Sequence, residues 1–160
     1  MKTLALFLDR DGVVNTEVNY VGRIEDFNFV DGIFNLCEKF QSAGYKIFII
    51  TNQAGLARGY YTENDFSNLT NWMINQFLKN GINITKVYYC PHHPDITGQC
   101  NCRKPNPGMI QQAEMEFDID VSNSILIGDN INDIMAGKSA GIGLNILIKT
   151  NVLPKYLVDP

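Results

Sequence analysis

The sequence has no excess of positive charge and no long hydrophobic run. Its 13 lysines and arginines stand against 17 aspartates and glutamates, which gives a formal net charge of −4. Such an acidic chain has no general attraction for nucleic acid or for an anionic membrane surface, and we expect neither as a partner. The first apolar run, residues 4–8, is too short for a signal peptide or a membrane span. We therefore expect a cytoplasmic protein.

Repeats, low-complexity tracts and linker-like stretches are also absent from the 160 residues. Hydrophobic residues make up 45% of the chain and charged residues 19%, which is ordinary for a globular protein and excludes a disordered or fibrous one. A chain of this length suits one hydrophobic core better than two. We expect a single domain, residues 1–160, and a monomer.

Short apolar runs alternate along the chain with segments of helical periodicity. The runs predict strands at residues 3–8, 45–50, 86–90, 124–128 and 144–148. Helices are predicted at residues 32–43, at residues 63–79 behind Thr62 as the N-cap, from Pro107 onward, and at residues 131–140. Strands that alternate with helices indicate an α/β fold with a parallel sheet and helices on both faces. In such folds the site lies at the carboxyl ends of the strands.

Polar side chains suited to phosphate or metal chemistry follow several of these strands. They are Asp9 and Asp11 after the first strand, Thr51 after the second, Lys104 just before the third helix, and Asp129 with Asp133 after the fourth strand. Carboxylates gathered at one sheet edge repel one another unless a cation lies among them, and their hard oxygen atoms suit Mg²⁺. The sequence therefore predicts an active site that holds a magnesium ion.

Each of these residues has a simpler explanation when it is taken alone. Aspartates are common in loops after strands, Asp129 could cap the next helix, and Lys104 could be a solvated surface charge. Chance placement of all of them at successive strand ends is much less common than any one of these cases. Their joint placement therefore favours an active site.

Three of the four cysteines are concentrated in one stretch of the chain. Cys90 and His92 are two residues apart, as are Cys100 and Cys102, so each pair faces one way along an extended chain. Three thiolates and an imidazole can enclose one Zn²⁺ ion in a structural site, and the alternative is a pair of surface thiols. Cys37 lies on the inward face of a predicted helix and is most simply a core residue.

The sequence resembles the haloacid dehalogenase superfamily of phosphatases in four ordered motifs. These read Phe7-Leu-Asp9-Arg-Asp11-Gly-Val-Val-Asn15, Thr51-Asn-Gln53, Arg103-Lys104-Pro105 and Gly128-Asp129-Asn-Ile-Asn-Asp133. Two longer stretches, residues 51–59 and 90–109, resemble the branch of histidinol phosphatases and heptose-bisphosphate phosphatases. The resemblance spans nearly the whole chain. It implies a three-layer, Rossmann-like fold with no cap domain, a short flap at residues 15–29 and a zinc-binding loop at about residues 90–107.

The resemblance also implies roles for the residues at the sheet edge. Asp9 would be the nucleophile that forms an aspartyl-phosphate, and Asp11 would be the acid that protonates the leaving oxygen. Mg²⁺ would lie between Asp9, the backbone carbonyl of Asp11 and Asp129. Thr51 and Lys104 would contact the phosphoryl oxygens. Asp133 would orient water bound to the metal.

Within this branch, the resemblance favours a small phosphorylated sugar as the substrate of this chain. The expected reaction is removal of the 7-phosphate from a heptose 1,7-bisphosphate. Residues expected to bind it are Glu17, Tyr20, Asn52, Gln53, Arg58, Arg103 and Asn130. His93 is expected to be structural or to face the substrate rather than to bind zinc. The zinc ligands would be Cys90, His92, Cys100 and Cys102. Two alternatives stay open: a histidinol-phosphate phosphatase, and a zinc-stabilised binding module without catalysis.

Overall fold

The computed structural model describes residues 1–159 and contains one five-stranded parallel sheet. The strands are β1 (Ala5–Leu8), β2 (Lys46–Asn52), β3 (Ile84–Cys90), β4 (Ile125–Gly128) and β5 (Leu144–Leu147). They pair in the order β3-β2-β1-β4-β5, which places β1 at the centre. The predicted parallel sheet is confirmed, and each predicted strand is present within two residues of its expected bounds.

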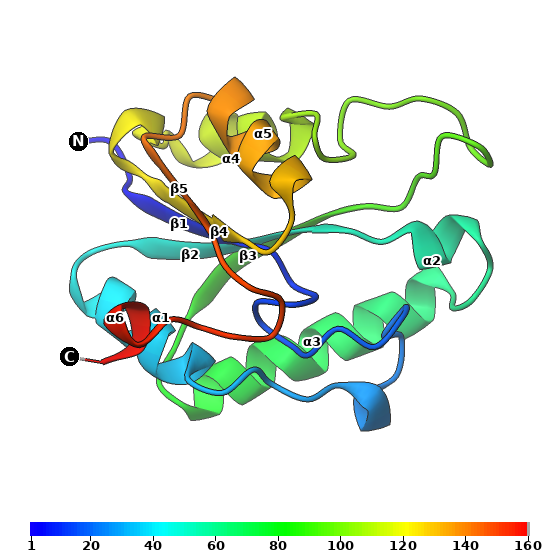
Figure 1. Ribbon diagram of the computed structural model, residues 1–160, viewed down its shortest axis with the longest axis horizontal. Helices are drawn as coiled ribbons and strands as arrows, with labels where there is room; N and C mark the ends of the chain where they lie inside the picture. The colour runs from blue at the N-terminus through cyan, green and yellow to red at the C-terminus, as the bar shows by residue number, and fades with distance from the viewer. Residues whose placement is uncertain (160) are drawn as a thin grey trace.

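Helices cover both faces of the sheet, as predicted (Figure 1). One face carries α1 (Ile33–Ser42), α3 (Glu63–Lys79) and α6 (Lys155–Val158), and the other carries α4 (Gly108–Phe117) and α5 (Ile131–Ser139). Along β1, Leu6 and Leu8 pack under the first group of helices, while Ala5 and Phe7 pack under the second. A strand covered on both faces has no solvent-facing side, which explains why its sequence is apolar throughout.

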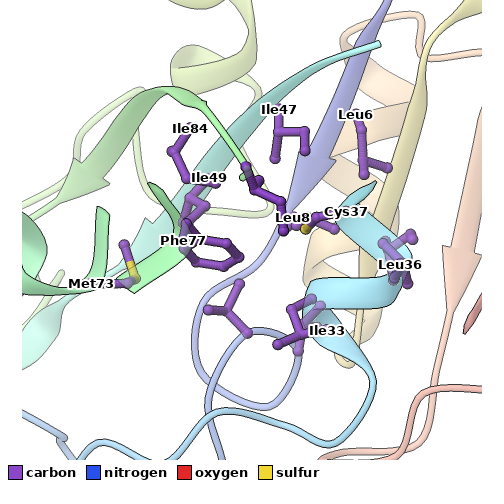
Figure 2. Close-up of a cluster of buried hydrophobic side chains, with 14 of the residues drawn as sticks. Leu6, Leu8, Ile33, Leu36, Cys37, Ile47, Ile49, Met73, Phe77 and Ile84 are labelled. Carbon is purple, nitrogen blue, oxygen red and sulfur yellow. The ribbon is translucent and has the colours of Figure 1, made fainter. Parts of the chain in front are cut away.

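The larger of the two cores lies between the sheet and helices α1 and α3. Figure 2 shows Leu6, Leu8, Ile47 and Ile49 of the sheet facing side chains of these two helices. Cys37 is fully buried there, as predicted for a core residue, and burial raises the pKa of its thiol. This packing holds β1 and β2 in place, and the carboxyl ends of these strands carry the candidate site.

The helix ends show where sequence patterns were sufficient and where they were not. Thr62 caps α3 in a reciprocal capping box with Asp65, as its side chain predicted. Pro107 lies at the N-cap of α4 rather than inside the helix, so α4 begins one residue later than expected. Four short elements were missed because they hold too few residues to show a period: the helices α2 (Ala54–Ala57) and α6, and the 3-10 turns Ile24–Asp26 and Val121–Asn123.

The connections between the strands contain no inserted cap domain within residues 1–159. The segment after β1 forms the predicted flap. Isolated β-bridges from Asn15 to Asp11 and to Phe29 hold it in place. Helices α2 and α3 fill the connection from β2 to β3, and a loop runs from β3 to α4. None of the described helices is both long enough and apolar enough to cross a membrane.

Candidate active site

Polar side chains from the ends of two neighbouring strands, one helix and one loop meet at the carboxyl edge of the sheet. Asp9 follows β1, Asp129 follows β4, and Asp133 lies in the first turn of α5. One carboxylate oxygen from each of the three lies within 4.8 Å of the others. Lys104 reaches this group from the loop before α4, and its Nζ lies 2.8 Å from Asp9 and 2.6 Å from Asp133. The structure therefore brings these predicted residues together.

The Lys104 ammonium is buried between its two acidic partners. It also donates to the carbonyl oxygen of Ile50 at 3.0 Å. Burial by itself lowers the pKa of Lys104, but the charges of Asp9 and Asp133 outweigh it and raise that pKa, so the lysine stays cationic. Burial raises the pKa of Asp9, and Lys104 offsets only part of that rise. A further positive charge beside Asp9 would favour its ionised form.

The donor set at this edge fits a magnesium ion. Three carboxylates face one ammonium, which leaves a local excess of negative charge on hard oxygen atoms. Asp133 has both oxygens engaged, one by Lys104 and the other by the backbone N–H of Asn130 in the capping box of α5. Within the described part of the chain, the Asp129 carboxylate accepts only from the Thr150 hydroxyl, at 2.9 Å. Asp9 and Asp129 are thus the carboxylates best placed to bind a metal directly.

Asp11 is held by a buried arginine that the sequence analysis overlooked. The Arg10 side chain is only 1% exposed, and its Nη2 donates to Asp11 Oδ1 at 2.9 Å and to the carbonyl oxygen of Val21 at 2.8 Å. Asn15 donates to the same Asp11 oxygen at 3.0 Å. An arginine in a loop between two aspartates is normally read as solvent-exposed. Its adjacency to both of the predicted catalytic carboxylates was the one available signal.

Asn52 lines the site but uses its side chain to hold the backbone of Lys104. Its Oδ1 accepts from the Lys104 N–H at 3.0 Å, and its Nδ2 donates to the Lys104 carbonyl oxygen at 3.3 Å. These two bonds fix the β2 end against the loop that carries Lys104. The expected role of Asn52 was contact with substrate, and the geometry adds this positioning role.

Gln53 was also expected to contact substrate, and its polar atoms face other side chains. Its Nε2 donates to Asp11 Oδ2 at 3.1 Å and to Thr51 Oγ1 at 2.8 Å. Its Oε1 accepts from the Tyr61 hydroxyl. Tyr61 is a second residue that the sequence analysis missed, because a tyrosine before a helix N-cap carries no chemical pattern.

Two adjoining cavities, of about 460 and 500 Å³, open over this edge. The larger contains Asp9, Lys104 and Asp129. Both are lined by Asp11, Glu17, Asn19, Asn52 and Arg103. Asp11 therefore lies where the two cavities meet. Burial, aided by the charge of Asp11, raises the pKa of Glu17.

The smaller cavity has a basic wall. It is lined by Arg58, His93 and Arg103, with Tyr20 from the flap. Arg58 Nη2 lies 3.2 Å from His93 Nε2, and the Arg58 guanidinium lies 5.9 Å from the centre of the Tyr20 ring. Arg103 donates to the His92 carbonyl oxygen at 3.3 Å. This wall suits an anionic group bound away from Asp9 and Asp129, which line only the larger cavity.

The predicted substrate residues divide between the two cavities. Those lining the smaller one are Glu17, Tyr20, Asn52, Gln53, Arg58 and Arg103. Asn130 lines only the larger one and also caps α5, where its side chain accepts from the Asn132 N–H. All seven predicted residues therefore border the combined space.

The cysteine cluster lies apart from the carboxylates, with Cys90 at the end of β3 and the other three residues in the loop that follows. Cys90 Sγ lies 3.5 Å from Cys100 Sγ, which in turn lies 3.6 Å from Cys102 Sγ. His92 Nδ1 lies 3.3 Å from Cys102 Sγ and 3.6 Å from Cys90 Sγ. A tetrahedral site with Zn–S bonds of about 2.3 Å has sulfur atoms about 3.8 Å apart. The spacing and the soft donor set therefore fit a zinc ion.

Comparison with known proteins identifies the family. The family model described as polynucleotide kinase 3 phosphatase matches residues 5–143. A D-glycero-alpha-D-manno-heptose-1,7-bisphosphate 7-phosphatase of Campylobacter jejuni is 55% identical over 148 residues, which are 92% of this chain and 84% of that protein. A D-glycero-beta-D-manno-heptose-1,7-bisphosphate 7-phosphatase of Yersinia pestis is 42% identical over 151 residues, which are 91% of this chain and 80% of that protein.

A solved structure agrees with this result. The crystal structure of D,D-heptose 1,7-bisphosphate phosphatase from B. bronchiseptica, complexed with magnesium and phosphate, superposes with a TM-score of 0.85 at 30% identity and covers 94% of this chain and 83% of that one. This chain therefore belongs to the haloacid dehalogenase-like phosphatases, in the family that contains the heptose 1,7-bisphosphate 7-phosphatases.

Proposed function

We propose that this phosphatase removes the 7-phosphate of a D-glycero-D-manno-heptose 1,7-bisphosphate through an aspartyl-phosphate intermediate. The observation that carries the proposal is the pair of joined cavities, one with Asp9 beside Lys104 and the other with a basic wall. The first suits the phosphoryl group that is transferred, and the second suits the phosphate that is retained. The names of the relatives support the same substrate.

In the first step, Asp9 attacks phosphorus and the bond to the sugar oxygen breaks. Lys104 and the Thr51 hydroxyl hold phosphoryl oxygens as their negative charge grows. Asp11 gives its proton to the leaving sugar oxygen, and in the second step it removes a proton from the water that attacks the aspartyl-phosphate. At the end of the cycle, phosphate is released and the ionised Asp9 carboxylate is regenerated.

Asp9, Asp129 and the backbone carbonyl of Asp11 would hold Mg²⁺, which supplies positive charge against the phosphoryl oxygens. The excess of negative charge among the carboxylates and the raised pKa of Asp9 support this assignment. Asp133 keeps Lys104 in place and would orient water on the metal. The sugar itself would contact Glu17 and residues of the smaller cavity.

Cys90, His92, Cys100 and Cys102 would hold a structural Zn²⁺ ion. Four protein ligands leave no position for water on the metal, so the ion would shape the loop without taking part in hydrolysis. Arg103 directly follows Cys102 and lines both cavities. The zinc would therefore fix the position of an arginine that faces the retained phosphate.

The basic wall favours a bisphosphate over histidinol phosphate. Histidinol phosphate would bring a cationic amine next to Arg58 and Arg103, whereas a second phosphate is attracted by both. A non-catalytic module is not favoured either, because Asp9, Asp11 and Lys104 are all in place. Relatives at 47–55% identity are named for the alpha anomer and those at 41–43% for the beta anomer, so we propose the alpha anomer.

A substrate panel tests the proposal. Phosphate release would be measured with the alpha and beta anomers of the heptose 1,7-bisphosphate and with histidinol phosphate, each with added magnesium. We expect the highest kcat/KM on the alpha anomer and the lowest on histidinol phosphate. A preference for histidinol phosphate would contradict the proposed substrate class, and a preference for the beta anomer would contradict only the anomer.

The proposal also includes a single-domain, monomeric enzyme that acts in the cytoplasm. The acidic composition and the lack of a long apolar run are what support it. Light scattering coupled to gel filtration tests the oligomeric state. A mass of twice 18.0 kDa in solution would contradict a monomer.

A further inference from the structure

The Asp11 carboxylate is held asymmetrically by N–H donors. Its Oδ1 accepts from Arg10 Nε at 3.2 Å, from Arg10 Nη2 at 2.9 Å and from Asn15 Nδ2 at 3.0 Å. Among residues 1–159, its Oδ2 accepts only from Gln53 Nε2, at 3.1 Å. Three donors leave Oδ1 no room for a proton of its own. A proton on this carboxyl therefore has to be carried by Oδ2.

The Gln53 amide can face Asp11 in only one orientation because of Tyr61. The Tyr61 hydroxyl donates to Gln53 Oε1, which turns the Nε2 end of the amide toward Asp11 and Thr51. Burial raises the pKa of Tyr61 to about 12, so the hydroxyl keeps its proton at neutral pH. Without this donor, the amide could rotate and present Oε1 to Asp11 instead.

Two glycines make the space that Tyr61 occupies. A Cβ atom at Gly22 in the flap or at Gly55 in α2 would overlap the Tyr61 ring. Neither glycine has the positive φ that would by itself require glycine. Their lack of a side chain therefore serves the close approach of the ring, which is only 7% exposed.

Arg10 is fixed from the opposite side. Its guanidinium lies 5.8 Å from the centre of the Phe27 ring and 5.9 Å from that of Phe66, and it donates to the flap at the Val21 carbonyl oxygen. Neither of these aromatic residues reaches the cavities. The arginine is thus part of the packing under Asp11 rather than a group that meets substrate.

We infer that Arg10, Gln53 and Tyr61 are positioning residues that hold Asp11 so that its Oδ2 carries the transferred proton and faces the junction of the two cavities. The inference rests on the proposed function, in which Asp11 is the acid. In the first step the Oδ2–H bond breaks and a bond from this hydrogen to the leaving sugar oxygen forms. In the second step a proton from the attacking water returns to Oδ2.

The sharpest test is Tyr61→Phe, which removes one hydroxyl and keeps the ring. Its matched control is Tyr88→Phe, because Tyr88 is also buried and its hydroxyl donates at 2.6 Å to Glu116, away from both cavities. Turnover is compared on the heptose bisphosphate, whose sugar oxygen needs a proton to leave, and on p-nitrophenyl phosphate, whose oxygen does not.

We expect Tyr61→Phe to lower kcat on the heptose bisphosphate about fivefold, the loss typical of one hydrogen bond, and to leave kcat on p-nitrophenyl phosphate nearly unchanged. Arg10→Lys keeps the charge but loses the forked contact, and it should show the same selectivity with a larger loss. Tyr88→Phe should alter neither rate. Equal losses on both substrates, or a Tyr61→Phe enzyme that behaves like Tyr88→Phe, would overturn the inference.

Neutron diffraction structures of the wild type and Tyr61→Phe, which locate the amide hydrogens, give a readout that needs no turnover. We expect the Gln53 amide or the Asp11 side chain to change orientation in the variant. An unchanged Gln53–Asp11 pair would overturn the inference even if the enzyme proved inactive on the heptose bisphosphate. Inactivity of the wild type on both substrates would instead contradict the proposed function, so the two failures are distinguishable.

Discussion

The carboxyl edge of the sheet and the cysteine loop both gather side chains that can bind a metal, but they do so in different ways. At the sheet edge, Asp9 and Asp129 follow paired strands, and Lys104 already compensates part of their charge. In the loop, the four donors come from one short stretch of chain that has no strand or helix between Cys90 and Gly108. Its backbone bonds are local, such as Thr97 to His93 and Gly108 to Asn101.

The fold alone builds the site at the sheet edge, whereas the site in the cysteine loop needs a bound metal ion to complete it. The sheet register sets the distance between Asp9 and Asp129 whether or not a metal is bound, because β1 and β4 pair directly. No comparable framework sets the distance between Cys90 and Cys100. We therefore expect loss of magnesium to stop catalysis without unfolding the protein, and loss of zinc to loosen the loop.

The largest effect should come from Asp9→Asn. A neutral amide does not attack phosphorus, so turnover should vanish, while the sheet edge keeps the ion pair between Lys104 and Asp133. Phosphate release and circular dichroism measure the two parts of this expectation. A variant that kept a few per cent of wild-type activity would exclude Asp9 as the nucleophile.

Lys104→Met tests the charge compensation that distinguishes the sheet edge. Loss of the buried ammonium should lower kcat by about 10² to 10³ and, because Asp9 and Asp133 then face each other unpaired, should destabilise the fold by about 3–5 kcal/mol. The matched control is Lys86→Met, since Lys86 pairs with Glu116 at the surface. Urea unfolding should separate the two variants, and similar midpoints would contradict the buried-pair explanation.

Cys100→Ser tests the loop. The wild type should hold about one zinc ion per chain through dialysis against weak chelators, and the variant should lose it and melt at a lower temperature. Cys37→Ala is the control, because Cys37 lies in the core and its loss should leave the zinc content unchanged. Elemental analysis and thermal unfolding give the result. Retention of zinc and of the melting temperature in Cys100→Ser would exclude a metal site.

Arg103 lies next to the cysteine loop and lines both cavities over the sheet edge. Of the four variants in this comparison, Arg103→Ala should have the smallest effect. A contact to the retained phosphate that is equally strong before and during the reaction should raise KM by about tenfold and change kcat little. The effect should shrink on heptose 7-phosphate, which lacks the second phosphate. Removal of zinc from the wild type should imitate the variant, since Arg103 follows Cys102 directly. Equal losses through kcat on both substrates would contradict this role.

The sequence predicted much of the site because the fold places strand ends together. Once β1, β2 and β4 were recognised from their apolar runs, the meeting of Asp9, Thr51 and Asp129 at one edge followed from the rule for parallel sheets. The four candidate zinc ligands were inferred from their spacing together with the family resemblance, and the structure brings the same four side chains together. Both predictions rest on patterns that are local in the chain.

The sequence by itself determined the order of the elements and which residue types lie at the strand ends, because periodicity and spacing are local properties. Only the tertiary structure decided that Arg10 is buried under Asp11, that Tyr61 orients Gln53, and that Lys104 lies between two carboxylates. Lys104 meets Asp9 across 95 positions of the chain, and no local pattern encodes such a pair. Burial then gives these distant contacts their strength, since a charge removed from water has to be compensated by whichever group the packing brings beside it.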